Sequence, residues 1–457
     1  MREEHLVRLL SRRDLLKGSA GLLAASALLN GCAAPAPSGT TSTASQAPSS
    51  QSVEDIYVMV LAAFADMSFR DATQMINDTL GEENYRYVLE EMAEGWETKV
   101  LAMVQEGDMR WSANGIADAG KQWNFVQQGM VQPLDDLLAS STIPWATNQR
   151  ENYVDPKIDD YTKVDGKTYY VPMKLNIHLM GYREDYLQAA GYDAIPETWD
   201  EFDVMLGKLK ETHEAENVLP FAARKEVFRT LGTAFTTFVE NPYDENNMLR
   251  INSEEWLDCI EMFKSWFDKG YTNLAVLQDP LPDWQSGKIA IGIDSHSWIR
   301  IGRSVWTAEK VKGTVPPKTD RNNPPRTWIH LDSGFVLGGA PRPQEGLDWL
   351  LSILGPEGGP ADRHWSGTLA FSGMPVHTNQ YEKLIANSDE FPELQAGYDA
   401  LKTSVLQPLE AGRYYPIIQS KIWPWLERYW GNEIDAKTAM QNVIDEVEQE
   451  VEKQITA

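Results

Sequence analysis

The chain has 457 residues, of which 42% are hydrophobic and 24% are charged, and its 41 Lys and Arg stand against 67 Asp and Glu, for a net charge of −26. This composition excludes collagen-like, coiled-coil and wholly disordered chains. The negative charge argues against a nucleic-acid partner, which would need a basic face. The length indicates two or more lobes, because single hydrophobic cores stop growing near roughly 250–300 residues.

The first 52 residues have the features of an export signal followed by a tether. Residues 1–17 are rich in Arg and Lys, and the apolar stretch 20–29 is too short to span a bilayer, which takes about 20 residues. Residues 11–17 resemble a twin-arginine signal, and Leu-Asn-Gly-Cys at 29–32 resembles the lipobox of bacterial lipoproteins. We therefore predict a signal peptide over 1–31, a lipid on Cys32, and a flexible, uncharged tether through residue 52.

Cysteine content limits the remaining chemistry. Cys32 and Cys259 are the only two cysteines, which excludes a disulfide scaffold and a multi-cysteine zinc site. With Cys32 lipidated, Cys259 would be the single free thiol.

Strand and helix patterns alternate along the rest of the chain. Apolar, β-rich runs predict strands, and a 3.6-residue apolar period predicts helices. Thr198 and Glu201 have the spacing of a capping box, and Pro172 is expected to end the strand before it. Strands are predicted at 56–62, 169–171, 288–293 and 334–338; helices at 66–78, 83–105, from about 199, from 252–255 to just before Gly270, and along 440–451. The alternation predicts an α/β fold with largely parallel sheets.

Motifs of common enzymes are absent from the sequence. It contains no nucleophile elbow, Walker loop, zinc-protease motif or dinucleotide-binding glycine motif, so we predict no catalytic residue, no metal site and no cofactor. Aromatic residues are plentiful instead, with 16 Trp, 17 Tyr and 13 Phe. Several stand beside Gly, Ser, Asn or Pro, where rings next to polar loops suit a sugar with one apolar face and many hydroxyls.

The middle of the chain resembles a known family. Residues 164–172 read Val-Asp-Gly-Lys-Thr-Tyr-Tyr-Val-Pro, 181–187 read Gly-Tyr-Arg-Glu-Asp-Tyr-Leu, and 196–202 read Pro-Glu-Thr-Trp-Asp-Glu-Phe. Together with the Pro-Leu-Asp segment near 133 and the Gly-Lys-Ile-Ala strand near 288, this order resembles the extracellular solute-binding proteins of ABC importers. The likeness is to their sugar-binding family 1, which includes maltose-binding protein. The strand that this family usually has before 96–107 is not evident, since 81–105 reads as helix.

The resemblance implies a two-lobed periplasmic-binding-protein-like fold of type II, with a hinge that the chain crosses several times. It places residues 53–172 and about 312–350 in an N-terminal lobe, and about 173–311 and 351–457 in a C-terminal lobe. Ligand would bind in the cleft between the lobes. By local match, the ligand-binding residues implied are Trp111, Asn114, Lys174, Asn176, Arg224, Asp294, Trp298, Ser333, Tyr414 and Trp423. Trp298 is expected to stack on a sugar ring.

The implied function is capture of a carbohydrate and its delivery to the membrane permease of an ABC transporter. The protein is expected to be a monomer on the outer face of the cell membrane, in the periplasm or at the cell surface. Two alternatives stay open: the same fold with a non-sugar solute, such as a phosphorylated polyol, a peptide-like compound or a polyamine, and an exported enzyme that acts on polysaccharide.

Overall fold

The computed structural model describes residues 53–456, apart from 82–83, 274–278, 372 and 387–391. The predicted signal peptide, Cys32 and the tether lie outside the described residues. The strands are β1 (Glu54–Leu61), β2 (Tyr85–Met92), β3 (Trp111–Ala117), β4 (Lys163–Val164), β5 (Lys167–Thr168), β6 (Val171–Arg183), β7 (Leu219–Ala222), β8 (Ile289–Ser295), β9 (Val311–Thr314) and β10 (Ile329–Val336).

Helices surround these strands. The helices of the first part of the chain are α2 (Ala62–Phe64), α3 (Arg70–Thr79), α4 (Trp96–Glu106), α5 (Ala119–Gln127), α6 (Asp135–Ser140), α7 (Gln149–Asn152), α8 (Glu184–Ala189), α9 (Trp199–His213) and α10 (Leu231–Phe235). Those of the second part are α11 (Glu254–Asp268), α13 (Leu281–Gln285), α14 (His296–Val305), α15 (Pro343–Leu354), α16 (Gly359–Phe371), α17 (Thr378–Tyr381), α18 (Pro392–Leu401), α19 (Tyr415–Trp430) and α20 (Ala436–Thr456). Short 3-10 and π segments include η1 (Ala65–Phe69), η2 (Pro156–Thr162) and η5 (Leu409–Arg413).

The main sheet has the strand order β2-β1-β3-β10-β6-β8-β7, and β9 also pairs with β6. Strands β1, β2 and β3 pair in parallel, as do β7 and β8, whereas β10 and β6 run antiparallel to their neighbours. The α/β prediction and the two-lobed fold class are confirmed. The sheet is mixed, however, instead of largely parallel, because β6 and β10 run antiparallel to each other and to the strands beside them.

The N-terminal half of the sheet is covered by helices on both faces. Along β1, Val58 and Val60 pack with η1, α3 and α15, while Met59 packs with α4 and α5 on the opposite face. Successive side chains of a strand point to opposite faces, so a strand covered on both sides is apolar throughout. The continuous apolar run at 56–62 is therefore explained by this three-layer packing.

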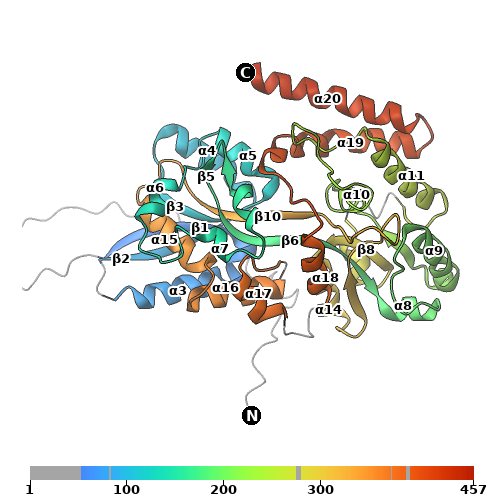
Figure 1. The fold of residues 1–457 in the computed structure, drawn as a ribbon, viewed down its shortest axis with the longest axis horizontal. Helices are drawn as coiled ribbons and strands as arrows, with labels where there is room; N and C mark the ends of the chain where they lie inside the picture. The colour runs from blue at the N-terminus through green and yellow to red at the C-terminus, as the bar shows by residue number, and fades with distance from the viewer. Residues whose placement is uncertain (1–52, 82–83, 274–278, 372, 387–391, 457) are drawn as a thin grey trace, which may run out of the picture. The chain divides into compact units, whose positions relative to one another are not determined.

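The C-terminal half repeats this arrangement with other helices. Met180 and Ile291 contribute to a core with α9, α11, α19 and α20, whereas Leu179 and Ile289 face a core with α13, α14 and α18. Figure 1 shows α3, α15 and α16, which belong to the N-terminal half, at one end of β6 and β10, and α9, α11 and α14 at the other end.

Strand β6 joins the two halves and changes its partner midway. Residues 171–177 pair with β10, and 178–183 pair with β8 and β9. Beside this change, the His178 amide donates to the Trp328 carbonyl at 3.0 Å, and the Gln407 amide donates to the Ile329 carbonyl at 2.9 Å. Three chain segments thus lie side by side here. The lobe boundaries predicted at 172 and about 312 stay a prediction, and the pairing favours positions nearer 177 and 328.

Two expectations about individual strands are wrong. Residues 85–92, predicted as the start of a helix, form the edge strand β2, which pairs in parallel with β1. Its half-exposed Tyr-Arg-Tyr-Val-Leu-Glu-Glu-Met sequence fits helix and strand alike, and only pairing decides between them. Pro172, expected to end a strand, lies inside β6 at a register shift opposite Ser333, where the ladder does not need its missing N–H.

Helix starts predicted from caps agree closely with the structure. The Thr198 hydroxyl accepts from the Glu201 amide at 3.4 Å and donates to the Glu201 carboxylate at 3.0 Å, which confirms the capping box of α9. Helix α11 is capped by Ser253, one residue after the predicted Asn252. The predicted helix along 440–451 is confirmed as part of α20.

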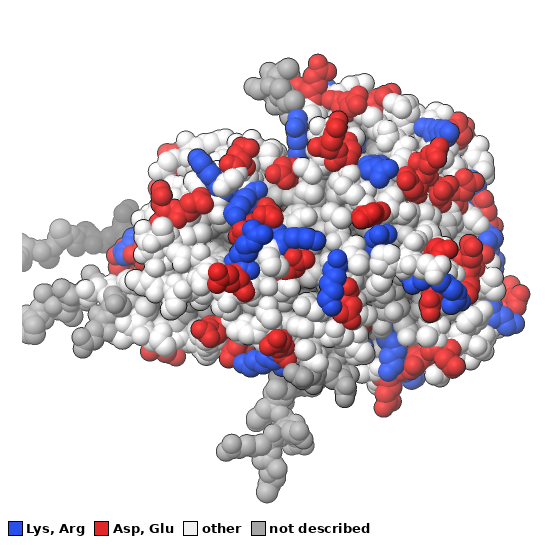
Figure 2. Space-filling view, viewed as in Figure 1, with Lys and Arg blue, Asp and Glu red and all other residues white. Residues whose placement is uncertain are grey.

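The surface carries charges of both signs. Figure 2 shows Lys and Arg next to Asp and Glu over the face in view. Lys402 and Asp399, for example, form an exposed pair with their charged atoms 3.0 Å apart. Exposed pairs of this kind add little to stability, about 0–1 kcal/mol each. Among the described residues, no helix has the length and hydropathy that a membrane span requires.

Candidate functional site

A cavity of about 490 Å³ is lined by residues from both halves of the sheet. Its volume lies within the usual range for small-molecule sites, roughly 300–1,000 Å³. The N-terminal half contributes Leu61, Phe64, Glu94, Trp96, Glu97, Ile116, Asp118, Lys121, Phe125, Lys174, Asn176 and Asp332. The C-terminal half contributes Glu226, Arg229, Ser295, Ser297, Ile301 and Tyr415. We call this space the interlobe cavity.

One wall of the interlobe cavity is a polar patch on two paired strands. In the ladder between β6 and β10, Lys174 lies opposite Asp332, and Asn176 lies opposite His330. Opposite residues of an antiparallel pair share a face, so these four side chains form one patch. The Lys174 ammonium is 3.4 Å from Asp332 Oδ2, and both residues are buried.

The patch contains two atoms without a hydrogen-bond partner among the described residues. Asn176 Oδ1 and Asp332 Oδ1 are both buried and unsatisfied. Burial raises the pKa of the Asp332 carboxyl, and Lys174 partly opposes that effect. A buried polar atom without a partner costs about 1–3 kcal/mol, so this wall is built to receive polar groups from a ligand.

The opposite wall carries a charged network from the C-terminal half. Arg229 donates to Glu226 at 2.6 Å and to Asp294 Oδ1 at 2.6 Å, and Arg224 donates to Asp294 Oδ2 at 2.9 Å. Burial alone would raise the pKa of Asp294, but Arg229 and Arg224 outweigh it and hold the pKa at about 2. Asp294 therefore stays ionised at neutral pH and fixes the position of the Arg229 guanidinium.

Aromatic rings border the same cavity. Trp96 and Phe125 meet edge to face with centroids 5.5 Å apart, and Tyr415 stacks on Phe228 at 4.1 Å. The Tyr415 hydroxyl donates to Glu226 Oε1 at 2.8 Å, which couples an aromatic surface to the charged network. Rings beside carboxylate, amide and guanidinium groups can bind a molecule that has apolar faces and hydroxyl groups at once.

His330 of the patch meets a second histidine, His178, next to the place where β6 changes partner. The rings of His178 and His330 meet edge to face at 5.3 Å. Burial, together with the charge of the neighbouring Arg229, lowers the pKa of both imidazoles below the usual range. Both rings are therefore neutral at physiological pH, where each has one nitrogen that can accept a hydrogen bond or bind a cation.

Of the ten ligand-binding residues predicted from the sequence, Lys174 and Asn176 line the interlobe cavity. Asp294 stands one contact behind the cavity, where it accepts a hydrogen bond from Arg229, and Arg224 donates to Asp294 from the other side. Their predicted contact with ligand stays a prediction.

The other six residues are not among those that line the interlobe cavity, and their predicted contact with ligand also stays a prediction. Trp111, Asn114 and Ser333 are buried inside β3 and β10. Trp298 and Trp423 belong to the hydrophobic cores of the C-terminal half. Tyr414 borders a separate cavity beneath α20, with Met248 and Val447 among its lining residues.

Several of the lining residues that sequence reasoning missed stand next to a predicted residue in the chain. Tyr415 follows the predicted Tyr414, Asp332 precedes Ser333, and Ser297 precedes Trp298. A shift of one residue along a strand turns the side chain to the opposite face, so a local match that is off by one selects the core side. Two of the missed residues stand at a helix start that the sequence could have indicated. Trp96 is the first residue of α4, directly after Gly95, and Asp118 caps α5 directly after β3.

Comparison with known proteins identifies the family of this chain. The profile of the bacterial extracellular solute-binding proteins matches residues 74–392. A binding protein of Brucella abortus is 25% identical over 182 residues, which are 38% of this chain, and one of Brucella suis matches equally. This chain thus spans 42% of the length of the curated relatives that it matches.

Solved structures of similar fold extend over most of the chain. The sugar-binding protein MalE of Xanthomonas citri has a TM-score of 0.70 at 13% identity, covering 88% of this chain and 98% of its own. The substrate-binding protein Lmo0181 of Listeria monocytogenes, solved with cycloalternan, has a TM-score of 0.68 at 13% identity, covering 87% of this chain and 98% of its own. The GacH receptor of Streptomyces glaucescens, solved with acarbose, has a TM-score of 0.68 at 15% identity, covering 86% of this chain and 97% of its own. These likenesses establish the fold, and the family profile covers more than half of the sequence: the chain belongs to the bacterial extracellular solute-binding proteins.

Proposed function

We propose that the protein binds a carbohydrate in the interlobe cavity and delivers it to the membrane permease of an ABC transporter. The observation that carries this proposal is the lining of the cavity, in which Trp96, Phe125 and Tyr415 stand beside Lys174, Asn176 and Arg229. Rings can stack on the apolar face of a sugar, while ammonium, amide and guanidinium groups bind its hydroxyls. Similar structures, which include a sugar-binding protein and complexes with cycloalternan and acarbose, give further support.

Binding would close the two halves around the ligand. Strand β6, the entry to β10 and the segment at 406–407 lie side by side where β6 changes its partner. We propose this place as the hinge, because a few residues at the ends of paired segments can absorb the rotation of two rigid halves.

A ligand screen distinguishes the open alternatives. Thermal unfolding is measured with maltooligosaccharides, monosaccharides, phosphorylated polyols and polyamines, since a ligand at 100 times its Kd stabilises by about 2.7 kcal/mol. A rise in melting temperature with one sugar class is expected. A rise only with phosphorylated or cationic compounds would contradict the carbohydrate, and cleavage of an oligosaccharide would favour the exported enzyme.

Asn176→Ala is expected to weaken binding of the identified sugar at least about tenfold, or ~1.4 kcal/mol. Its Oδ1 atom is buried in the cavity wall without a protein partner. Removing an unsatisfied atom should leave the melting temperature within a few degrees of wild type. Isothermal titration calorimetry measures the affinity, and Asn152→Ala, in α7 outside the cavity, is the matched control. Equal affinities of the two variants would contradict the proposed site.

We also propose that the protein is a lipoprotein, exported by a twin-arginine signal and held on the outer face of the cell membrane through Cys32. The Leu-Asn-Gly-Cys segment at 29–32 supports this proposal. Cys32→Ser is expected to abolish labelling by radioactive palmitate and to move the protein from the membrane to the soluble fraction, because acyl chains supply the attachment. Cys259→Ser, which removes the other cysteine, is the control and should leave both readouts unchanged.

A further inference from the structure

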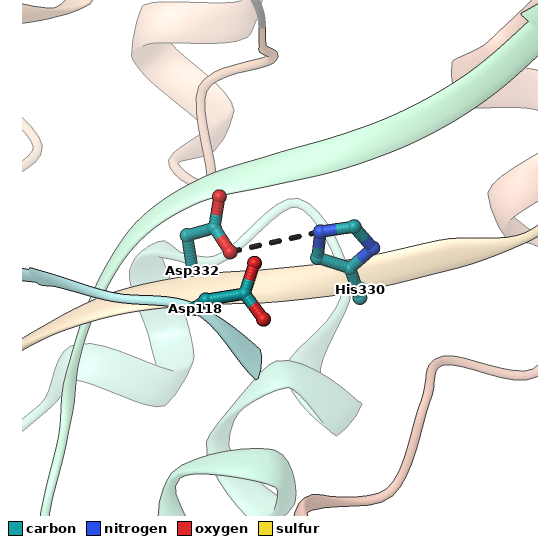
Figure 3. Close-up of side chains that lie close together, drawn as sticks. All are labelled: Asp118, His330 and Asp332. Atoms are coloured by element: carbon teal, nitrogen blue, oxygen red, sulfur yellow. Dashed lines mark ion pairs between the residues drawn. The ribbon is translucent and has the colours of Figure 1, made fainter. Parts of the chain in front are cut away.

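Three side chains that can bind a metal converge where the end of β3 meets β10, at the edge of the polar patch described above. Asp118 follows β3, and His330 and Asp332 lie two residues apart on β10, on one face of the strand. Ligand atoms of all three lie within 4.8 Å of one another, and His330 Nε2 is 3.6 Å from Asp332 Oδ1. Figure 3 shows the two carboxylates and the imidazole turned toward a common point.

The bonding of these residues leaves room for one more partner. Asp332 is 4% exposed, and its Oδ1 has no hydrogen-bond partner among the described residues, although Oδ2 is 3.4 Å from the Lys174 ammonium. Asp118 accepts the Gly120 amide with Oδ1 at 2.9 Å as the cap of α5, so Oδ2 can bind another group. A buried carboxylate oxygen without a donor is costly, which indicates a partner that the chain itself does not supply.

The surrounding charge also favours a cation. Four charged side chains act electrostatically on the His330 imidazole, namely Asp118, Lys174, Glu226 and Arg229, and a fifth, Asp332, lies 3.6 Å from it. With three carboxylates and two cations they leave a net charge of −1, so a bound cation would not meet an excess of positive charge. Lys174 is paired with Asp332 through Oδ2, which leaves Oδ1 for a cation, and Arg229 is paired with Asp294, a further carboxylate outside these five.

We infer that Asp118, His330 and Asp332 form a site for a divalent transition-metal cation on the wall of the interlobe cavity. One imidazole nitrogen and two carboxylate oxygens suit Zn²⁺ and its neighbours, whereas Ca²⁺ and Mg²⁺ prefer oxygen ligands alone. Three protein ligands leave at least one position open, and Asp118 and Asp332 both line the cavity. If the proposed function holds, a pair of sugar hydroxyls would occupy that position.

The test is a calorimetric titration of Zn²⁺ into the full chain after treatment with a chelator, without sugar. We expect one equivalent to bind, and Asp118→Asn to weaken the binding at least about tenfold, because the amide retains the helix cap but loses the charge. His330→Gln should weaken it similarly. Asp155→Asn is the matched control, since Asp155 caps η2 by accepting the Lys157 amide at 2.9 Å and lies outside the cavity.

Two results would overturn the site: wild-type protein that binds no stoichiometric Zn²⁺, or Asp118→Asn that binds it as tightly as Asp155→Asn does. Binding of Ca²⁺ as tightly as Zn²⁺ would also overturn it, since it would indicate general attraction to acidic groups. A parallel sugar titration separates the two proposals. Zn²⁺ binding without any sugar binding would contradict the proposed function and support the site, and sugar binding without Zn²⁺ binding would do the reverse.

Discussion

Trp298→Ala is expected to lower the free energy of unfolding by about 3–5 kcal/mol, the usual cost of removing a buried Trp side chain. The indole stacks on Trp284 at 4.9 Å with 21° between the ring planes, and it is 3% exposed. Two glycines shape its pocket: a Cβ at Gly181 or Gly292 would lie 2.6 or 2.7 Å from the ring. The ring therefore fills a space that no neighbour can occupy after its removal.

Chemical denaturation followed by circular dichroism measures this loss, and Trp425→Ala is the control. Trp425 is only partly buried on α19, where its indole donates to Glu446 at 3.0 Å, so its removal should cost clearly less. The affinity for sugar per folded molecule should stay near the wild-type value in both variants. A Trp298→Ala protein with normal stability and much weaker sugar binding would restore the stacking role that the family resemblance implies.

Asp294→Asn is expected to have the second largest effect, a loss of about 2 kcal/mol at pH 7. The pKa of this carboxyl falls from 3.8 to about 2 on folding, because Arg229 and Arg224 outweigh the effect of burial, and each pKa unit corresponds to about 1.36 kcal/mol. A carboxyl with a depressed pKa stabilises the fold fully above its unfolded pKa and loses this contribution as the pH falls through its folded pKa. The wild-type advantage should therefore persist down to about pH 4 and disappear toward pH 2.

Urea unfolding of wild type and Asp294→Asn at several pH values between 7 and 2.5 tests this prediction. Asp399→Asn is the control, because Asp399 forms an exposed pair with Lys402 and should contribute less than about 1 kcal/mol at any of these pH values. A difference between wild type and Asp294→Asn that does not change with pH would contradict the prediction, because it would show that ionisation of the carboxyl is not the source of the loss. Sugar affinity should also fall in this variant, since Asp294 positions Arg229 at the cavity.

Local signals in the sequence carried the prediction of most elements. The capping box at Thr198, the apolar run of β1 and the apolar period of α20 each reflect interactions within a few residues, so they can be read without knowledge of the fold. Residues 85–92 show the limit of such signals. Their half-exposed pattern fits a helix until β1 offers a partner, and a parallel partner from another part of the chain leaves no local mark.

By itself, the sequence determined that strands and helices alternate, the absence of common catalytic motifs, the family, and two residues of the cavity wall, Lys174 and Asn176. Only the tertiary structure decided which aromatic rings border the cavity and which lie in the cores alone, because Trp96 and Trp298 both lie in the first turn of a helix but have different neighbours in space. The tertiary structure alone likewise decided that Asp118 lies close to His330 and Asp332. A site built across two strands depends on register, and register is set by the packing of the whole sheet.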